Sequence, residues 1–210
     1  MKPSMKVAAA MSDSPKNHLI LASTSPYRRE LLQRLGIPFE VISPNVDETP
    51  LPGESTVALA LRLAQAKAAA VAKDYPHAWV IGSDQVANFC GAAIGKPGNF
   101  ERAMAQLQLM RGATVIFQTA LCLMHGAAET TINIPTEVRF RNLPDEALEA
   151  YLLTEQPYDC AGSAKSEGLG ISLLEQVKSD DPTALIGLPL IALSGLLRAA
   201  GFAIPPKPTN

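Results

Sequence analysis

Polar and charged side chains gather in a few short stretches of this sequence, and the first of these stretches suits the binding of an anion. It covers residues 23–29 (STSPYRR) and follows the apolar run 19–22. Ser25 is a good N-cap and Pro26 suits the first helical position, so we expect a strand that leads into a helix start. Such a start presents unpaired backbone N–H groups and the positive end of the helix dipole. Two arginines in the same turn add donors shaped for phosphate oxygens, although ordinary capping with solvated arginines is an alternative.

Four further stretches place acids and bases at the ends of predicted elements, where sites are usually built. They are residues 45–49 (NVDET), 82–85 (GSDQ), 95–97 (GKP) and 162–168 (GSAKSEG). Asp84 is the most informative residue among them, because a carboxylate directly after an apolar strand lies at the edge of a sheet and is seldom on open surface. An aspartate that only caps a turn is the alternative.

Together these stretches could bind a triphosphate. Five cations could surround its oxygens, namely Arg28, Arg29, Lys67, Lys96 and Lys165. Glu48 and Asp84 could hold a divalent cation through oxygen atoms, as Mg²⁺ requires, or Asp84 could take a proton from an attacking water. Lys67 has a second interpretation, because it lies four residues after Leu63 on a predicted helix and could snorkel from the apolar stripe. No P-loop motif occurs, which excludes a Walker-type NTPase.

Alternating strands and helices must hold these stretches in place. Strands are predicted at 19–22, 39–42, 78–82, 115–124 and 130–140, the last two forming a hairpin near Gly126. Helices are predicted between Ser25 and Gly36 and after Ser55, Asn99, Pro144 and Pro189. The mixture indicates an α/β or α+β fold with a mixed sheet.

The composition is that of a globular protein, with 47% hydrophobic and 18% charged residues among 210. A net charge of -2 argues against a surface adapted to nucleic acid or anionic membrane, although a local cluster still allows a small polyanion. Three scattered cysteines without a CxxC pair suit reduced thiols. No run approaches the ~20 apolar residues of a membrane span. We therefore expect a cytoplasmic protein with no stable nucleic-acid partner and no membrane partner.

One domain is expected over residues 18–203. Residues 1–17 loosely imitate a signal peptide, but their apolar part is too short, so we expect a mobile extension there. The proline-rich residues 204–210 are predicted to form a frayed tail.

Five of these motifs, in this order, resemble those of the Maf family of nucleotide pyrophosphatases. They are residues 23–32 (STSPYRRELL), 46–49 (VDET), 82–86 (GSDQV), 95–97 (GKP) and 161–168 (AGSAKSEG). The resemblance runs from about Leu19 to about Gly201, which is nearly the whole chain. It is closest to the branch that hydrolyses 7-methyl-GTP to 7-methyl-GMP and diphosphate.

The resemblance implies a two-lobed α/β architecture with a long, bent mixed sheet, similar to that of the inosine triphosphate pyrophosphatases, and an active cleft between the lobes. It implies a requirement for a divalent cation, Mg²⁺ or Mn²⁺, and family members often form homodimers. Asp84 falls on the family's proton acceptor. The three positions that separate substrate branches fall on Tyr27, Gln85 and Glu167. Positions associated with phosphate or metal contacts fall on Arg28, Glu48, Lys67, Lys96 and Lys165.

The charge of the substrate supports the assignment to this branch. Methylation at N7 makes the guanine ring cationic, and the branch acting on dTTP and UTP typically has an arginine at the position of Tyr27. A tyrosine ring attracts a cation by about 0.5–2 kcal/mol, where an arginine would repel it. Glu167 could balance the same charge. Some members of the branch carry Trp at the position of Tyr27, a departure that should weaken stacking modestly.

The resulting mechanism is a hypothesis. The triphosphate lies over the helix start at Ser25, clamped by Arg28 and the lysines, while Glu48 and Asp84 place the metal. Asp84 orients or deprotonates a water for attack at the α-phosphorus, and whether it is base, metal ligand or both stays open.

Three alternatives remain. A hydrolase of another class would use Ser163 and Lys165 as nucleophile and base, but no GxSxG motif accompanies them. A non-catalytic nucleotide-binding regulator of cell division is the second. The third is a dTTP or UTP pyrophosphatase of the same family, against which Tyr27 and Glu167 speak.

Overall fold

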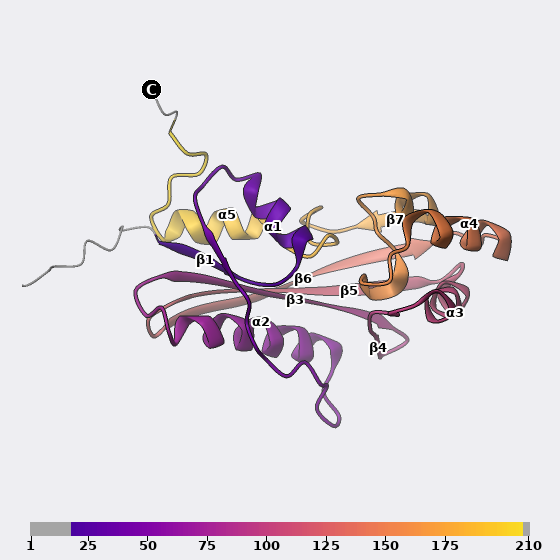
Figure 1. Cartoon of the computed structure of the whole chain (residues 1–210), viewed down its shortest axis with the longest axis horizontal. Coiled ribbons are helices and arrows are strands. Elements are labelled where there is room, and N and C mark those ends of the chain that lie inside the picture. Colours follow the sequence, from indigo (N-terminus) through magenta and orange to yellow (C-terminus); the bar gives the residue numbers. More distant parts are fainter. Residues whose placement is uncertain (1–17, 208–210) are drawn as a thin grey trace, which may run out of the picture.

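A seven-stranded mixed sheet forms the centre of the computed structural model, which describes residues 18–207 (Figure 1). Its strands are β1 (Leu19–Ala22), β2 (Glu40–Ile42), β3 (Trp79–Phe89), β4 (Ala92–Ile94), β5 (Thr114–His125), β6 (Ala128–Phe140) and β7 (Leu174–Lys178). Its helices are α1 (Pro26–Gln33), α2 (Thr56–Ala72), α3 (Phe100–Met110), α4 (Asp145–Glu155) and α5 (Leu190–Ala199), with 3-10 turns at Ala161–Ser163 and Leu169–Leu173.

The strand order is β2-β1-β3-β5-β6-β7, and β4 pairs with β3 outside this path. β1 is parallel to β2 and β3, whereas the neighbouring pairs β3–β5, β5–β6 and β6–β7 are antiparallel. The predicted hairpin is β5–β6, and its turn contains Gly126 with a positive φ. The expected mixed α/β sheet is confirmed.

Helix starts follow the predicted capping residues. Ser25, Ser55 and Asn99 each accept a hydrogen bond from the backbone N–H three residues further on, as N-caps do. α5 lacks such a cap on Pro189, and the buried carboxylate of Asp181 replaces it by accepting from two backbone N–H groups of the first turn.

The molecule has two lobes, one that contains α1, α2 and α5 and one that contains α3 and α4. Two hydrophobic clusters fill the first lobe and a third fills the second. α2 covers one face of the sheet and α1 with α5 covers the opposite face, while α3 and α4 lie at the far end of β5 and β6 (Figure 1). β3 and β5 contribute to clusters of both lobes, so the lobes share these strands. This matches the two-lobed architecture that the resemblance to the Maf family implies.

One prediction about β3 is wrong. The polar stretch 82–85 was expected after the end of a strand, but β3 continues without interruption to Phe89. The polar side chains remain in the strand because each finds a partner there: Ser83 and Gln85 contact backbone carbonyls, and Asp84 contacts Lys67. Burial without partners would have been too costly for these groups.

The edge of β3 opposite β5 has a gap. β1 pairs with β3 as far as Gly82, and β4 pairs with it from Ala87 onward. Among the strands of residues 18–207, only β5 therefore pairs with Ser83–Val86. This gap lies between the two lobes and leaves one side of the strand open to a ligand.

The predicted extension at residues 1–17 lies outside the described part of the chain. The predicted tail begins at Ile204, which packs against the hydrophobic cluster between the sheet and helices α1 and α5. Its carbonyl accepts a hydrogen bond from Arg198. Within residues 18–207, none of the helices combines the length and the apolar character needed to cross a bilayer.

Candidate active site

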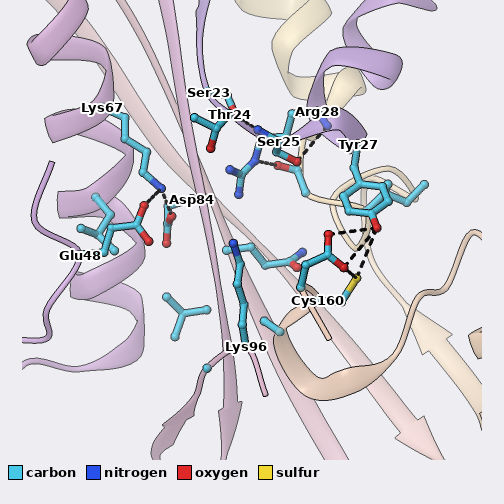
Figure 2. Close-up of a pocket in the computed structure, with 18 of the residues that line it drawn as sticks. Ser23, Thr24, Ser25, Tyr27, Arg28, Glu48, Lys67, Asp84, Lys96 and Cys160 are labelled. Carbon is cyan, nitrogen blue, oxygen red and sulfur yellow. Dashed lines mark hydrogen bonds and ion pairs between the residues drawn. The ribbon is translucent and has the colours of Figure 1, made fainter. Parts of the chain in front are cut away.

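A cavity of about 530 Å³ opens at the gap in the sheet. Figure 2 shows charged side chains at one side of it, an aromatic and a thiol side chain at the other, and two further cations between. These residues are Glu48, Lys67 and Asp84, then Tyr27 and Cys160, and then Arg28 and Lys96.

The turn between β1 and α1 supplies the cavity's anion-binding features. Ser25 Oγ accepts from the backbone N–H of Arg28 at 3.4 Å, and Ser23 Oγ accepts from the backbone N–H of Ser25 at 3.1 Å. Ser25, Pro26 and Tyr27 all line the cavity, so the positive end of α1 faces it. Arg28 Nε donates to the carbonyl of Gly187 at 2.8 Å, which fixes the guanidinium at the wall. Burial lowers the pKa of Arg28 and the charges of Asp84 and Glu48 raise it, but the group stays protonated.

A buried lysine joins two carboxylates at the charged end. Lys67 Nζ lies 2.6 Å from Oε1 of Glu48 and 2.6 Å from Oδ1 of Asp84. Lys67 and Asp84 are each only 6% exposed, whereas Glu48 is exposed. Burial raises the pKa of Glu48, but the hydrogen bond and charge of Lys67, with the charges of Lys96 and Arg28, outweigh it, so the pKa is lowered. Lys67 thus bonds carboxylates and does not simply snorkel.

Gly82 brings α2 close enough to β3 for this contact. A Cβ at Gly82 would lie 2.1 Å from the carbonyl oxygen of Ala64 and 2.7 Å from the backbone nitrogen of Ala68. Because Gly82 has no side chain, the backbone of α2 can rest on β3. The contact lies within one turn of Lys67 on the helix and two residues before Asp84 on the strand.

The aromatic end of the cavity carries carboxylates as well. The hydroxyl of Tyr27 donates to Asp159 at 3.3 Å, and the thiol of Cys160 lies 3.9 Å from the same hydroxyl. Asp159 and Glu167 both line the cavity and are exposed. Burial, followed by the effects of Cys160 and Asp159, holds the pKa of Tyr27 well above its ordinary value, so the phenol is neutral.

The segment 184–187 closes the wall beside β3. Gln85 Nε2 donates to the carbonyl oxygens of Ala184 and Leu185, both at 2.9 Å. Ser83 Oγ lies 2.9 Å from the carbonyl oxygen of Gly187, and the same oxygen accepts the hydrogen bond from Arg28 Nε. Two strand side chains therefore set the position of this segment, and through it the position of the arginine.

Residues 18–200 match the family described as Maf-like protein. The chain belongs to the Maf family. A relative from Polaromonas sp. (strain JS666) named 7-methyl-GTP pyrophosphatase is 59% identical over 208 residues, covering 97% of this chain and 94% of the relative. One from Cupriavidus metallidurans with the same name is 62% identical over 194 residues, covering 91% and 98%.

A solved HAM1 protein from Coxiella burnetii overlaps the chain with a TM-score of 0.42 at 17% identity, covering 61% of this chain and 75% of that one. At this level of overlap, the fold assignment rests on the Maf family match and on the chain's own sheet topology.

Most of the predicted Maf site residues meet at the cavity. Those that line it are Ser25, Tyr27, Arg28, Glu48, Lys67, Asp84, Gln85, Lys96 and Glu167. Lys165 is not among the lining residues: its ammonium pairs with Glu155 at 2.9 Å and lies 5.7 Å from the centre of the Tyr27 ring. Arg29 is exposed and does not line this cavity.

The alternative nucleophile is held elsewhere. Ser163 is fully buried, outside the cavity lining, and its hydroxyl donates to Oε1 of Gln106 at 2.6 Å. The ammonium of Lys165 donates to Glu155 instead, and among residues 18–207 no hydrogen bond joins the side chains of Ser163 and Lys165. A serine hydrolase therefore has no support in this geometry.

Asp159, Cys160 and the 184–187 segment were not found by the sequence reasoning. Asp159 lies two residues before the AGSAKSEG motif, but an exposed aspartate in a turn gives no distinctive signal. Only the fold brings it to Tyr27, 132 residues away in the chain.

Proposed function

We propose that this protein hydrolyses 7-methyl-GTP to 7-methyl-GMP and diphosphate. The observation that supports this most directly is one cavity that joins a buried carboxylate–lysine pair to an aromatic end bearing two further carboxylates. The first end suits reaction at a phosphate, and the second suits a cationic base. Relatives with 59–62% identity over most of the chain carry the name of this activity.

The phosphate chain is proposed to lie between the two ends. Arg28, Lys96 and the start of α1 at Ser25 would contact its oxygens, because these donors face the middle of the cavity (Figure 2). Lys165 was predicted to join them, and that contact stays a prediction, since its ammonium is bound to Glu155.

Asp84 is proposed to orient a water toward the α-phosphorus and to accept its proton. The water oxygen forms a bond to that phosphorus, the bond to the bridging oxygen of diphosphate breaks, and diphosphate leaves with the electron pair. Before the substrate binds, Lys67 holds the Asp84 carboxylate in place through the 2.6 Å contact, and its ammonium can then offer positive charge to the reacting phosphate.

The base is proposed to lie against Tyr27. Its N7-methylated ring is cationic, and Asp159 and Glu167 give this end two negative charges. The ammonium of Lys165 near the ring is balanced by Glu155, so the end stays electronegative. Gln85 is the third proposed specificity residue, and its amide nitrogen is bonded to segment 184–185, which leaves its amide oxygen available to the base.

A divalent cation, Mg²⁺ or Mn²⁺, is proposed to be required. Glu48 and Asp84 offer the oxygen atoms that such a cation prefers. Within residues 18–207, however, no group of three or more His, Cys, Asp or Glu side chains is placed to hold one, and the ammonium of Lys67 already lies between the two carboxylates. As arranged, these residues do not fit a metal held by the free protein.

Cytoplasmic residence, one domain over 18–203 and a homodimer are also proposed. All three cysteines of the chain lie in the described part and are free thiols, which suits a reducing compartment. Size-exclusion chromatography with light scattering tests the dimer.

The deciding experiment is diphosphate release from 7-methyl-GTP, GTP, dTTP, UTP and CTP with Mg²⁺ or Mn²⁺. A strong preference for 7-methyl-GTP over GTP supports the proposal. A preference for dTTP or UTP overturns the substrate, and tight binding without release of diphosphate points instead to a non-catalytic binding protein.

A further inference from the structure

The contacts of Lys67 bear on how a metal reaches this site. Its ammonium lies 2.6 Å from one oxygen of Glu48 and 2.6 Å from one oxygen of Asp84, and its side chain is almost completely buried. The space shared by the two carboxylates, where a bridging cation would be bound, is therefore held by a cation that belongs to the protein.

The surrounding charges oppose a second cation. Arg28 and Lys96 also act on Glu48, so three cationic side chains surround two carboxylates. The positive charge of Arg62 also attracts the Asp84 carboxylate from further away, but an ion pair with Glu54 at 2.6 Å neutralises it. A divalent ion entering alone would meet net positive charge and would have to displace a buried ammonium from both of its partners.

A triphosphate reverses this balance. Its several negative charges exceed the positive excess of the site, and its oxygens can take up Arg28, Lys96 and the ammonium of Lys67. Once those cations face phosphate, the oxygens of Glu48 and Asp84 would be free, and they could hold a metal together with the phosphates.

We propose that residues 18–207 of the free protein form no resident metal site, and that Mg²⁺ or Mn²⁺ enters this cavity only as a complex with the nucleoside triphosphate, with Lys67 holding Glu48 and Asp84 until then. This inference rests on the proposed function. It makes the metal–nucleotide complex the true substrate, and it makes Lys67 a positioning residue whose bond partners change when the substrate binds.

The test measures metal binding and not turnover. The full chain is titrated with Mn²⁺ alone, and again with the α,β-methylene analogue of 7-methyl-GTP present, and EPR separates protein-bound Mn²⁺ from the Mn²⁺–analogue complex recorded without protein. The wild type should bind Mn²⁺ at least about 10-fold more tightly in the complex with the analogue than alone, within the 5–150-fold range usual for linked sites. One tightly bound Mn²⁺ per chain without nucleotide would overturn the inference.

A pair of variants tests the role of Lys67 itself. Lys67→Met removes the charge and keeps the length of the side chain, and Lys73→Met is the matched control at the exposed end of α2. We expect Lys67→Met to bind Mn²⁺ alone at least about 10-fold more tightly than the wild type, and Lys73→Met to match the wild type. No gain in a folded Lys67→Met protein contradicts the role of Lys67.

This outcome is separable from the proposed function. Binding of Mn²⁺ by the free wild type refutes the inference even if 7-methyl-GTP is hydrolysed. Failure to hydrolyse 7-methyl-GTP refutes the proposed function, whatever the metal titration gives.

Discussion

Asp84 is the residue on which the proposed reaction depends, because it is buried, ionically paired and in contact with the cavity. Asp84→Asn keeps the shape of the side chain and one oxygen for Lys67 but removes the base. Turnover of 7-methyl-GTP should fall at least ~10²-fold, the scale of general-base catalysis. Steady-state diphosphate release measures it, with Asp74→Asn at the distant end of α2 as control. Near-normal turnover of Asp84→Asn would remove this residue from the mechanism.

Tyr27 is expected to recognise the charge of the base. Tyr27→Arg exchanges an attractive ring for a repelling cation, so the preference for 7-methyl-GTP over GTP, as a ratio of kcat/KM, should fall at least ~2-fold from loss of the ring's 0.5–2 kcal/mol alone. Tyr27→Phe is the matched control, because it keeps the ring and loses only the hydroxyl with its contacts to Asp159 and Cys160. An unchanged preference in Tyr27→Arg would show that the base lies elsewhere.

At this scale the sequence predicts residues whose signals are local. Ser25 and Pro26 predict a helix start, because capping depends only on residues close in the sequence. The pairing of Lys67 with two carboxylates could not be predicted, because it depends on how α2 crosses β3. Asp159 was missed for the same reason, since its partner Tyr27 lies 132 residues away.

At the scale of elements, the close approach of α2 to β3 depends on Gly82. In Gly82→Ala the new Cβ would meet the helix backbone at 2.1 Å, so α2 must move away from the strand. We expect a loss of about 3 kcal/mol or more in the free energy of unfolding, because overpacking against backbone exceeds the usual 1–3 kcal/mol. Turnover should fall too, since Lys67 moves with the helix.

Urea unfolding measures this change. Gly195→Ala on α5 is the control, because open space surrounds that glycine and alanine favours a helix by about 0.5–1 kcal/mol. A Gly82→Ala protein as stable as the wild type would mean that α2 does not depend on this contact.

Most elements were predicted close to where they lie, and two short strands were missed. α1, α2 and α3 begin at the expected caps, and the β5–β6 hairpin lies where the alternating pattern placed it. β4 and β7 were not predicted, because neither segment shows a clear strand pattern, whereas the apolar residues of 19–22 and 39–42 indicated the equally short β1 and β2. The polar Ser83–Gln85 hid the continuation of β3, since partners on other elements satisfy those side chains.

At the scale of the whole molecule, the three thiols report how tightly the two lobes are packed. Cys90 is exposed, burial raises the pKa of Cys122 to about 11, and burial with the charge of Asp159 raises the pKa of Cys160 to about 12. A raised pKa lowers the thiolate fraction at pH 8, and the thiolate is the reactive form.

Alkylation by iodoacetamide at pH 8 should therefore modify Cys90 quickly, Cys160, which lines the cavity, much more slowly, and the buried Cys122 only after unfolding. Mass spectrometry of the labelled peptides identifies each site. Labelling of Cys160 in the native protein as fast as that of Cys90 would show that the cavity end near Tyr27 is more open than the structure has it.

The gap beside β3 also bears on the solubility of the molecule. An unpaired strand edge is where sheets of different chains join and aggregate. Here the open edge, Ser83–Val86, spans about 13 Å at about 3.3 Å per residue and is bounded by β1 and β4. A foreign strand of ordinary length cannot be added there without displacing a native neighbour, whereas a small molecule fits. The protein can thus keep a permanently open sheet edge for its ligand without exposing a template for self-association.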